Sequence, residues 1–148
     1  MSSQGKKSSS SDARILLVED DPGIRRFLEV VVARGGFIVD TATDGAEALS
    51  LLEQNTYDLM LLDLMLPRFS GFDVIPALRK LKTRPAVIVV TSNDTTDLDP
   101  EIISSVVRKP FDLNELMTLV KATASAAARR RRRRQRRKRG VQERRQQL

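Results

Sequence analysis

Short apolar runs alternate with segments of helical periodicity five times along this chain, and this alternation constrains the fold more than any other feature. The runs are almost wholly apolar, which is the pattern of strands that are covered on both faces. Strands that alternate with helices are typical of a parallel sheet with helices on both sides, because parallel strands need crossover connections. The five expected strands lie at residues 15–18, 37–39, 57–62, 86–90 and 106–107.

Capping residues mark where several of the intervening helices should begin. Asp21 precedes Pro22, and proline is common at the first helical position. Asp44 and Glu47 have the spacing of a capping box, in which the two residues satisfy each other's backbone N–H groups. Asp112 should start the last helix in the same way. These signals, together with apolar residues at helical spacing, predict a helix after each of the first two strands and after the fifth.

Two segments fit the alternation less well. Pro76 lies inside the third helical pattern and fits it only if that helix begins late enough to place Pro76 in its first turn. Residues 94–100 are polar and are interrupted by a proline, which leaves room for about one or two helical turns before the fifth strand. The fourth helix is therefore predicted to be short or irregular.

Composition excludes several kinds of site. The chain has no Cys and no His, which excludes disulfides, thiol catalysis, Ser-His-Asp chemistry and nearly all transition-metal catalysis. The absence of Cys fits a reducing cytoplasm, where we expect the protein to be located. No apolar run approaches 18 residues, so we expect no transmembrane segment. The Ser-rich start of the chain also lacks the apolar core of a secretory signal.

The net charge of +7 is distributed very unevenly. Residues 1–11 carry +2, residues 12–128 carry −6 and residues 129–148 carry +11, which together give +7. We therefore expect a disordered Ser-rich leader at 1–11, one folded acidic domain at 12–128, and a disordered Arg-rich tail at 129–148. The sequence pI of about 10.4 describes the tail and not the folded part.

Polar residues follow four of the expected strands at their carboxyl ends: residues 19–21, Asp63, residues 91–92 and Lys109. A parallel sheet brings these ends to one edge, where such folds bind ligands. Crowded carboxylates repel one another, and a hard cation such as Mg²⁺ relieves that repulsion. With a lysine and a hydroxyl nearby, the cluster has the groups that phosphoryl transfer needs, and a buried Asp can act as the nucleophile.

Four stretches of the sequence resemble the receiver domains of two-component response regulators: residues 15–21, 57–67, 87–92 and 109–111. The resemblance covers about residues 12–128. It implies a flavodoxin-like, doubly wound (βα)5 fold with a five-stranded parallel sheet in the order 2-1-3-4-5. It also implies a phosphorelay signalling domain, and not a turnover enzyme, that receives a phosphoryl group from a sensor histidine kinase or a phosphotransfer protein. Phosphorylation would then change the affinity for an output protein that the sequence does not identify.

The resemblance assigns the acidic residues to a phosphoacceptor and a metal site. Asp63 would be the phosphoacceptor. Mg²⁺ would be bound directly by Asp20 and through water by Glu19, and Asp63 and the backbone carbonyl of Met65 would complete the metal site.

The resemblance also assigns the residues around the phosphoryl group. Lys109, Thr91 and Ser92 would contact or adjoin the phosphoryl oxygens, and the peptide bond between Lys109 and Pro110 should be cis. Thr91 would move inward as the switch. The family commonly has an aromatic residue three positions before the lysine, coupled to the threonine, but this chain has Val106 there.

Each of these groups also has an ordinary structural interpretation. Residues 19–21 could be a solvated helix start, since acidic residues favour helix N-termini, and Lys109 could be an ordinary surface lysine. The joint occurrence of all four groups at strand ends favours the site. An aspartyl phosphatase is disfavoured because such enzymes commonly need a second Asp two residues after the nucleophile, where this chain has Met65.

The basic tail leaves several alternatives open. It could be solvated without a dedicated partner, fold back on the acidic domain, or bind nucleic acid or an anionic membrane by electrostatics. A nucleic-acid-binding protein with a vestigial receiver is the main alternative function. The tail has no aromatic residue for base stacking, so binding should not depend on sequence. The candidate polyanion-binding residues are Arg129, Arg130, Arg131, Arg132, Arg133, Arg134, Arg136, Arg137, Lys138 and Arg139.

Overall fold

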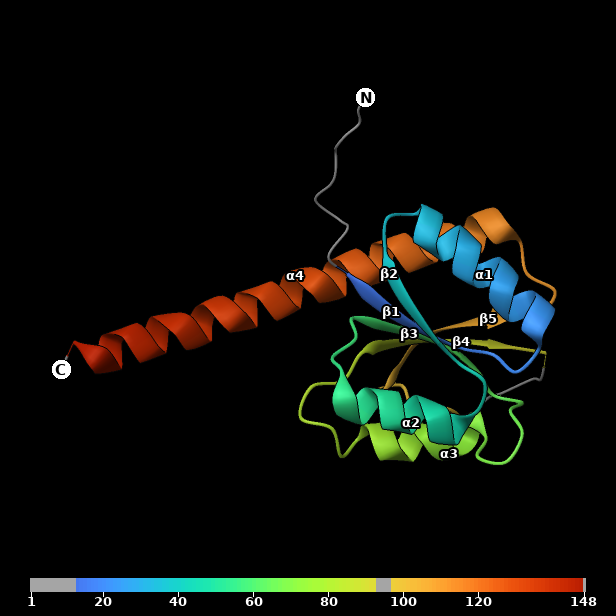
Figure 1. Cartoon of the computed structure of the whole chain (residues 1–148), viewed down its shortest axis with the longest axis horizontal. Coiled ribbons are helices and arrows are strands. Elements are labelled where there is room, and N and C mark those ends of the chain that lie inside the picture. The colour runs from blue at the N-terminus through green and yellow to red at the C-terminus, as the bar shows by residue number, and fades with distance from the viewer. Residues whose placement is uncertain (1–12, 93–96, 148) are drawn as a thin grey trace, which may run out of the picture.

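The structure is a computed structural model, and it describes residues 13–92 and 97–147. Five strands form one sheet in the order β2-β1-β3-β4-β5, and every neighbouring pair is parallel. The predicted strand order is therefore confirmed (Figure 1). The strands are β1 (Arg14–Val18), β2 (Ile38–Ala42), β3 (Leu59–Asp63), β4 (Ala86–Thr91) and β5 (Ile103–Arg108).

Helices cover both faces of this sheet. Helices α1 (Pro22–Arg34) and α4 (Leu113–Gln146) lie on one face, and α2 (Gly45–Gln54) and α3 (Gly71–Leu78) lie on the other (Figure 1). Successive residues of a strand point to opposite faces, so each strand contributes to two separate cores. In β1, for example, Leu16 belongs to the core beneath α2 and α3, whereas Leu17 belongs to the core beneath α1 and α4. Burial on both faces explains why the central strands are continuously apolar.

The predicted helix starts are confirmed. The side chain of Asp21 accepts a hydrogen bond from Ile24 N at 2.9 Å, and that of Asp44 accepts one from Glu47 N at 2.8 Å. Asp112 caps α4 in the same way. Each cap satisfies a backbone N–H group that has no partner within its own helix. The caps therefore fix where the chain turns from the sheet edge into each helix.

Helix α3 begins at Gly71 and therefore places Pro76 in its interior and not in its first turn. The earlier start is favoured by Ser70 at the N-cap, whose backbone N–H donates to Asp73 at 3.2 Å. Pro76 lacks an N–H group and cannot complete the hydrogen-bond ladder at its position. The helix ends two residues later, at Leu78.

The connection between β4 and β5 is short. Described residues 97–102 contain no helix, and the main chain turns at Asp99, whose carbonyl accepts hydrogen bonds from the N–H groups of Ile102 and Ile103. Part of the predicted irregular fourth helix, residues 93–96, lies outside the described residues. The last predicted helix is consequently α4.

The expected disordered tail is instead helical. Helix α4 runs without interruption for 34 residues, from Leu113 to Gln146. Its first part packs on the sheet through residues that include Leu116, Val120 and Ala124. The helix is therefore already nucleated when it reaches the arginines, and extending an existing helix is far easier than starting one. Arginine, lysine and glutamine are also good helix formers.

We call residues 129–146 the basic arm, and Figure 1 shows that this part of α4 projects away from the sheet. The first residues of the arm contact the domain, where Arg131 pairs with Asp58, and the remainder does not fold back over it. Within the described residues, no helix combines the length and hydropathy needed to cross a lipid bilayer. The expected Ser-rich leader, residues 1–11, lies outside the described part of the chain.

Candidate functional site

Three carboxylates converge where β1 and β3 end. Glu19 and Asp20 follow β1, and Asp63 is the last residue of β3. One oxygen from each side chain lies within 4.8 Å of the other two. Glu19 and Asp63 are buried, whereas Asp20 is exposed, so the cluster opens towards solvent on one side. An all-oxygen donor set of this size fits a hard divalent cation such as Mg²⁺.

Strand register accounts for this convergence. Val18 of β1 pairs with Leu62 of β3, so Glu19 and Asp63 each follow directly after paired residues. The N–H of Glu19 also donates to the carbonyl of Ala42, at 3.1 Å, which holds the end of β1 against β2. The carboxylates thus meet because the carboxyl ends of these parallel strands lie at the same edge of the sheet, as the sequence predicted.

Lys109 follows the edge strand β5, and its side chain reaches the same cluster. Its Nζ atom donates to Glu19 Oε1 at 2.9 Å and lies 3.4 Å from Asp63 Oδ2. Its backbone N–H donates to the carbonyl of Thr91 at 2.8 Å, which ties the chain after β5 to the end of β4. The peptide bond between Lys109 and Pro110 is cis, the conformation that the family resemblance implies.

The charges in this cluster influence one another. Burial raises the pKa of Glu19, and the adjacent Asp63 raises it further, although Lys109 acts in the opposite direction. Burial alone would lower the pKa of Lys109, but its hydrogen bond to Glu19 and the charge of Asp63 outweigh that effect and raise it. When all are ionised, three carboxylates and one ammonium leave a net charge of −2, which a divalent cation neutralises.

The polar residues after β4 lie beside this cluster. Asp63 pairs with Val90, so Thr91 is one residue further along the neighbouring strand, and its side chain is fully buried. Ser92 follows it and is exposed. Sequence reasoning thus located a hydroxyl residue at the carboxyl end of the strand next to Asp63.

The loop after β3 bends around Asp63. The backbone N–H of Met65 donates to Asp63 Oδ1 at 3.0 Å, while the Met65 side chain is 54% exposed. Gly71, the first residue of α3, lies against the same segment: a Cβ atom there would be 2.6 Å from the carbonyl oxygen of Asp63. Apart from the glycine itself, no sequence pattern indicates this close approach.

Val106 and Arg25 lie outside the cluster of carboxylates. Val106 lies on β5 opposite Val89 and is 43% exposed, so it is at the surface and not among the carboxylates. Arg25, which the sequence analysis missed, donates from Nη1 to the main-chain carbonyls of Glu19, at 3.0 Å, and Asp20, at 3.2 Å. Arg25 thereby holds the loop that carries both acidic residues.

Comparison with known proteins agrees with this geometry. The family model described as the response regulator receiver domain matches residues 15–121. The chain is 38% identical over 113 residues to the response regulator ArlR of Staphylococcus saprophyticus, covering 74% of this chain and 51% of ArlR. ArlR of Staphylococcus aureus is 36% identical over the same length, with the same coverage. The chain thus spans about half the length of these curated relatives.

Solved structures of response regulators also resemble this chain. The response regulator TrrA of Thermotoga maritima, in complex with Mg²⁺ and BeF, superimposes with a TM-score of 0.69 at 35% identity, covering 76% of this chain and 99% of TrrA. A receiver domain from Francisella superimposes with a TM-score of 0.70 at 28% identity, covering 78% of this chain and 98% of that domain. On the evidence of its sheet order, its acidic cluster and these matches, the chain belongs to the response regulator receiver domain family of two-component systems.

Proposed function

We propose that this receiver domain accepts a phosphoryl group on Asp63 from a sensor histidine kinase or a phosphotransfer protein, in a Mg²⁺-dependent reaction that changes its affinity for an output protein. The observation that carries the proposal is the convergence of three carboxylates and Lys109 at one sheet edge. The structure of histidine kinase ThkA in complex with TrrA supports the kind of donor, because TrrA is 34% identical to this chain and superimposes with a TM-score of 0.66. We place the reaction in the cytoplasm.

Asp63 is the nucleophile in this proposal. A carboxylate oxygen of Asp63 forms a bond to phosphorus while the bond between phosphorus and the donor's imidazole nitrogen breaks. The burial of Asp63 keeps bulk water away from the acyl phosphate that results. Its anchoring hydrogen bond from the Met65 N–H orients the side chain before the donor arrives.

The metal would be held by Asp20 and Asp63 directly, by Glu19 through water, and by the backbone carbonyl of Met65. When bound, Mg²⁺ supplies positive charge that offsets the negative charge of the phosphoryl oxygens and the carboxylates. The net charge of −2 on the ionised cluster and the separations within 4.8 Å support this assignment.

Lys109 and Thr91 would bind the phosphoryl oxygens. The Lys109 ammonium is only 3.4 Å from Asp63 and can transfer its hydrogen bond from Glu19 to a phosphoryl oxygen. Thr91, at the end of β4, would donate its hydroxyl, and the small side chain of Ser92 would leave space beside the phosphate. Val106 would occupy the position of the usual aromatic switch residue, so Thr91 would move against a smaller and exposed neighbour.

The surface changed by phosphorylation would be the one formed by β5 and α4. A surface hollow of this region is lined by Val106, Phe111 and Glu115, among other residues, and it lies next to the segment that carries Lys109. Movement of Lys109 towards a phosphoryl group would therefore be transmitted directly to this hollow.

Incubation with acetyl phosphate and Mg²⁺, followed by intact-mass measurement, tests the proposal. We expect the mass of one phosphoryl group to be added, and we expect the addition to be lost with EDTA and in Asp63→Asn. Asp97→Asn, which changes an exposed carboxylate, is the matched control and should be phosphorylated normally. Equal phosphorylation of Asp63→Asn would refute the assignment.

A further inference from the structure

The direction of the basic arm is fixed by a contact with the domain. Arg131 Nε donates to Asp58 Oδ1 at 2.8 Å, and Nη2 donates to Oδ2 at 3.3 Å, which is the bidentate geometry of a strong charged pair. Asp58 is buried just before β3 and also accepts the N–H of Arg14 at 3.0 Å. Because α4 is continuous through Arg131, this pair holds the rest of the arm as a rod that points away from the sheet (Figure 1).

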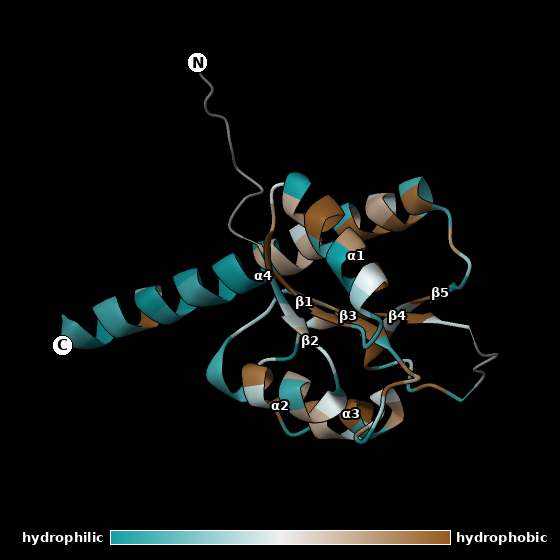
Figure 2. Ribbon diagram, turned by 45° about the vertical axis from the view of Figure 1, so that its right-hand side comes forward, coloured by the Kyte–Doolittle hydropathy of each residue, from teal (hydrophilic) through white to brown (hydrophobic). Residues whose placement is uncertain are grey.

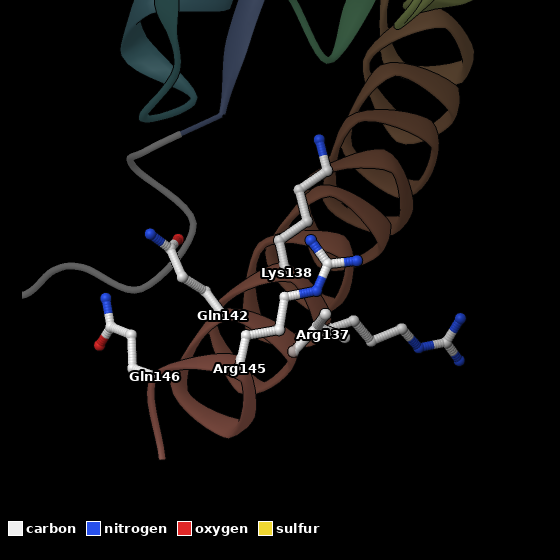
Figure 3. Close-up of a pocket in the computed structure, with 6 residues that line it drawn as sticks. Arg137, Lys138, Gln142, Arg145 and Gln146 are labelled. Atoms are coloured by element: carbon white, nitrogen blue, oxygen red, sulfur yellow. The ribbon is translucent and has the colours of Figure 1, made fainter. Parts of the chain in front are cut away.

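The arm is cationic on every side. It carries twelve Lys or Arg residues and one Glu, and Arg129–Arg134 alone occupy more than a full helical turn. Figure 2 shows this part of α4 as uniformly hydrophilic, apart from one small apolar spot. In Figure 3, the side chains of Arg137, Lys138 and Arg145 extend from the helix in different directions. The hollow that they line is formed by one helix alone, so it is an open surface.

The composition of the basic arm favours some kinds of polyanion over others as its partner. A helix that binds a lipid surface needs an apolar face to insert, but Val141 is the only large apolar residue in the sequence of the arm. Binding of single-stranded nucleic acid relies on aromatic side chains that stack on bases, and the arm contains no aromatic residue. A rigid helix with cations all around instead suits a groove that has phosphates on both walls.

We propose that the basic arm binds double-stranded DNA, lying in the major groove and contacting phosphates without regard to base sequence. The major groove is about 12 Å wide and admits an α-helix, whose diameter is about 10–12 Å. The 18 residues of the arm span about 27 Å, and that length of duplex carries about 16 phosphates. The arm's net charge of +11 is opposite in sign to these phosphates and smaller than their number, and one of its cations, Arg131, is paired with Asp58.

The charges of the arm and the domain favour the same arrangement. Like charges three or four residues apart destabilise a helix, so the arm's cations repel one another until an anion lies between them. Duplex DNA would relieve this repulsion and stabilise the helix. The domain at residues 12–128 has a net charge of −6 and would be repelled by DNA, so a projecting arm keeps the domain clear of the duplex.

Binding of the full chain to a random-sequence 20-base-pair duplex, measured by fluorescence anisotropy across a range of salt concentrations, tests the charge requirement. If seven to nine phosphates are contacted, log K should fall with log salt at a slope of about −6 to −8. Replacing Arg133, Arg136, Arg137 and Lys138 with Gln should reduce the magnitude of that slope by about 3 to 4. A slope near zero would overturn the proposal.

A matched control separates the arm from overall charge. Replacement of Arg34, Lys80, Lys82 and Lys121 with Gln removes the same charge from exposed positions outside the arm. We expect this variant to bind within about twofold of the unchanged chain, allowing for the weak screened effect of distant charges. An equal loss in both four-residue variants would show that only the net charge matters, and would overturn the proposal.

The requirement for a helix is tested by Gln135→Pro, which keeps every charge but interrupts α4 beyond Arg131. We expect affinity for the duplex to fall about tenfold or more, whereas Gln135→Ala should bind normally. Amide exchange of β3 should be unchanged in both variants, which verifies that the domain remains folded. Normal binding by Gln135→Pro would show that the helix is not needed and would contradict the proposal.

Competition identifies the partner. Unlabelled duplex DNA should displace the labelled duplex at lower nucleotide concentration than single-stranded DNA, double-stranded RNA or vesicles of anionic phospholipid. Equal or better competition by any of the other three would overturn the choice of duplex DNA. These measurements involve neither Asp63 nor Mg²⁺, so the inference stands or falls independently of the phosphoacceptor.

Discussion

The ammonium of Lys109 lies closer to Glu19 than to Asp63: its Nζ atom is 2.9 Å from Glu19 Oε1 and 3.4 Å from Asp63 Oδ2. Both carboxylates are buried, so the lysine offsets part of a repulsion that solvent screens poorly. A divalent cation at this cluster would take over that function. In the proposed site Lys109 and Mg²⁺ would therefore compete for Glu19, and displacement by the metal would leave Lys109 available for the phosphoryl group.

Replacement of Lys109 with Met should strengthen Mg²⁺ binding, because the cluster loses its own cation. We expect the dissociation constant to fall about tenfold, which corresponds to about 1.4 kcal/mol. Isothermal titration calorimetry of the full chain measures this. Lys121→Met, on the exposed side of α4, is the control and should leave the constant unchanged. Weaker Mg²⁺ binding by Lys109→Met would contradict the competition.

Mg²⁺ binding should weaken as the pH falls towards the raised pKa of Glu19. The pKa of Glu19 is raised, mainly by burial, so this carboxylate takes up a proton at a higher pH than an ordinary glutamate does. Protons and the metal compete for the same oxygens, and the loss of affinity should therefore follow that raised pKa. Calorimetric titrations with Mg²⁺ at several pH values measure whether the affinity falls as the pH is lowered.

Glu19→Gln should move the midpoint of this pH dependence downwards, because the group with the raised pKa is gone. The exposed Glu53 provides the control, since Glu53→Gln should leave the midpoint in place. Equal midpoints for the unchanged chain and Glu19→Gln would show that the carboxylate of Glu19 does not contribute to this pH dependence.

Alanine at Gly71 should destabilise the domain. Its Cβ atom would lie 2.6 Å from the carbonyl oxygen of Asp63 and 2.7 Å from Leu64 Cα, so the backbone that carries the phosphoacceptor would have to move. We expect a loss of about 1–3 kcal/mol in the free energy of unfolding, measured by urea denaturation.

Alanine at Gly140 is the matched substitution in open space, where the nearest atom is Arg144 Nη1 at 3.5 Å. Because Gly140 lies inside α4, alanine should stabilise the arm's helix by about 0.5–1 kcal/mol. Far-ultraviolet circular dichroism should therefore report unchanged or greater helicity. Equal stability losses at Gly71 and Gly140 would contradict the close approach of α3 to Asp63.

Replacement of Arg131 with Gln should destabilise the junction of the arm and the domain. Asp58 would be left buried with the N–H of Arg14 but without its charged partner, at a cost of about 2 kcal/mol. Amide exchange in α4 near Ala124 should become faster. Arg130→Gln, at an adjacent exposed position, is the control and should change stability by less than about 0.5 kcal/mol. Equal effects of the two substitutions would rule out a specific role for the pair.

The sequence was sufficient to predict the sheet and the meeting of the site residues. Buried parallel strands are continuously apolar, and their carboxyl ends must share an edge, so the positions of Asp20, Asp63 and Lys109 followed from local pattern alone. The assignment of individual roles relied on the family resemblance, and these roles remain predictions.

Other features depend on contacts that no local pattern encodes. The helical arm was predicted to be disordered because its composition is highly charged, but its helix is nucleated on the domain before the arginines begin. The pair of Arg131 and Asp58 joins residues 73 positions apart in the chain. The apolar spacing around Pro76 did not indicate where α3 begins, because that start depends on the cap at Ser70.

The location of the phosphoryl group tests the central claim most directly. Borohydride reduces an aspartyl phosphate to homoserine, so treatment after incubation with acetyl phosphate and Mg²⁺, followed by peptide mass analysis, identifies the modified residue. We predict homoserine at position 63, and none there when Mg²⁺ is omitted. Homoserine at Asp20 or at any other position, with position 63 unmodified, would contradict the account.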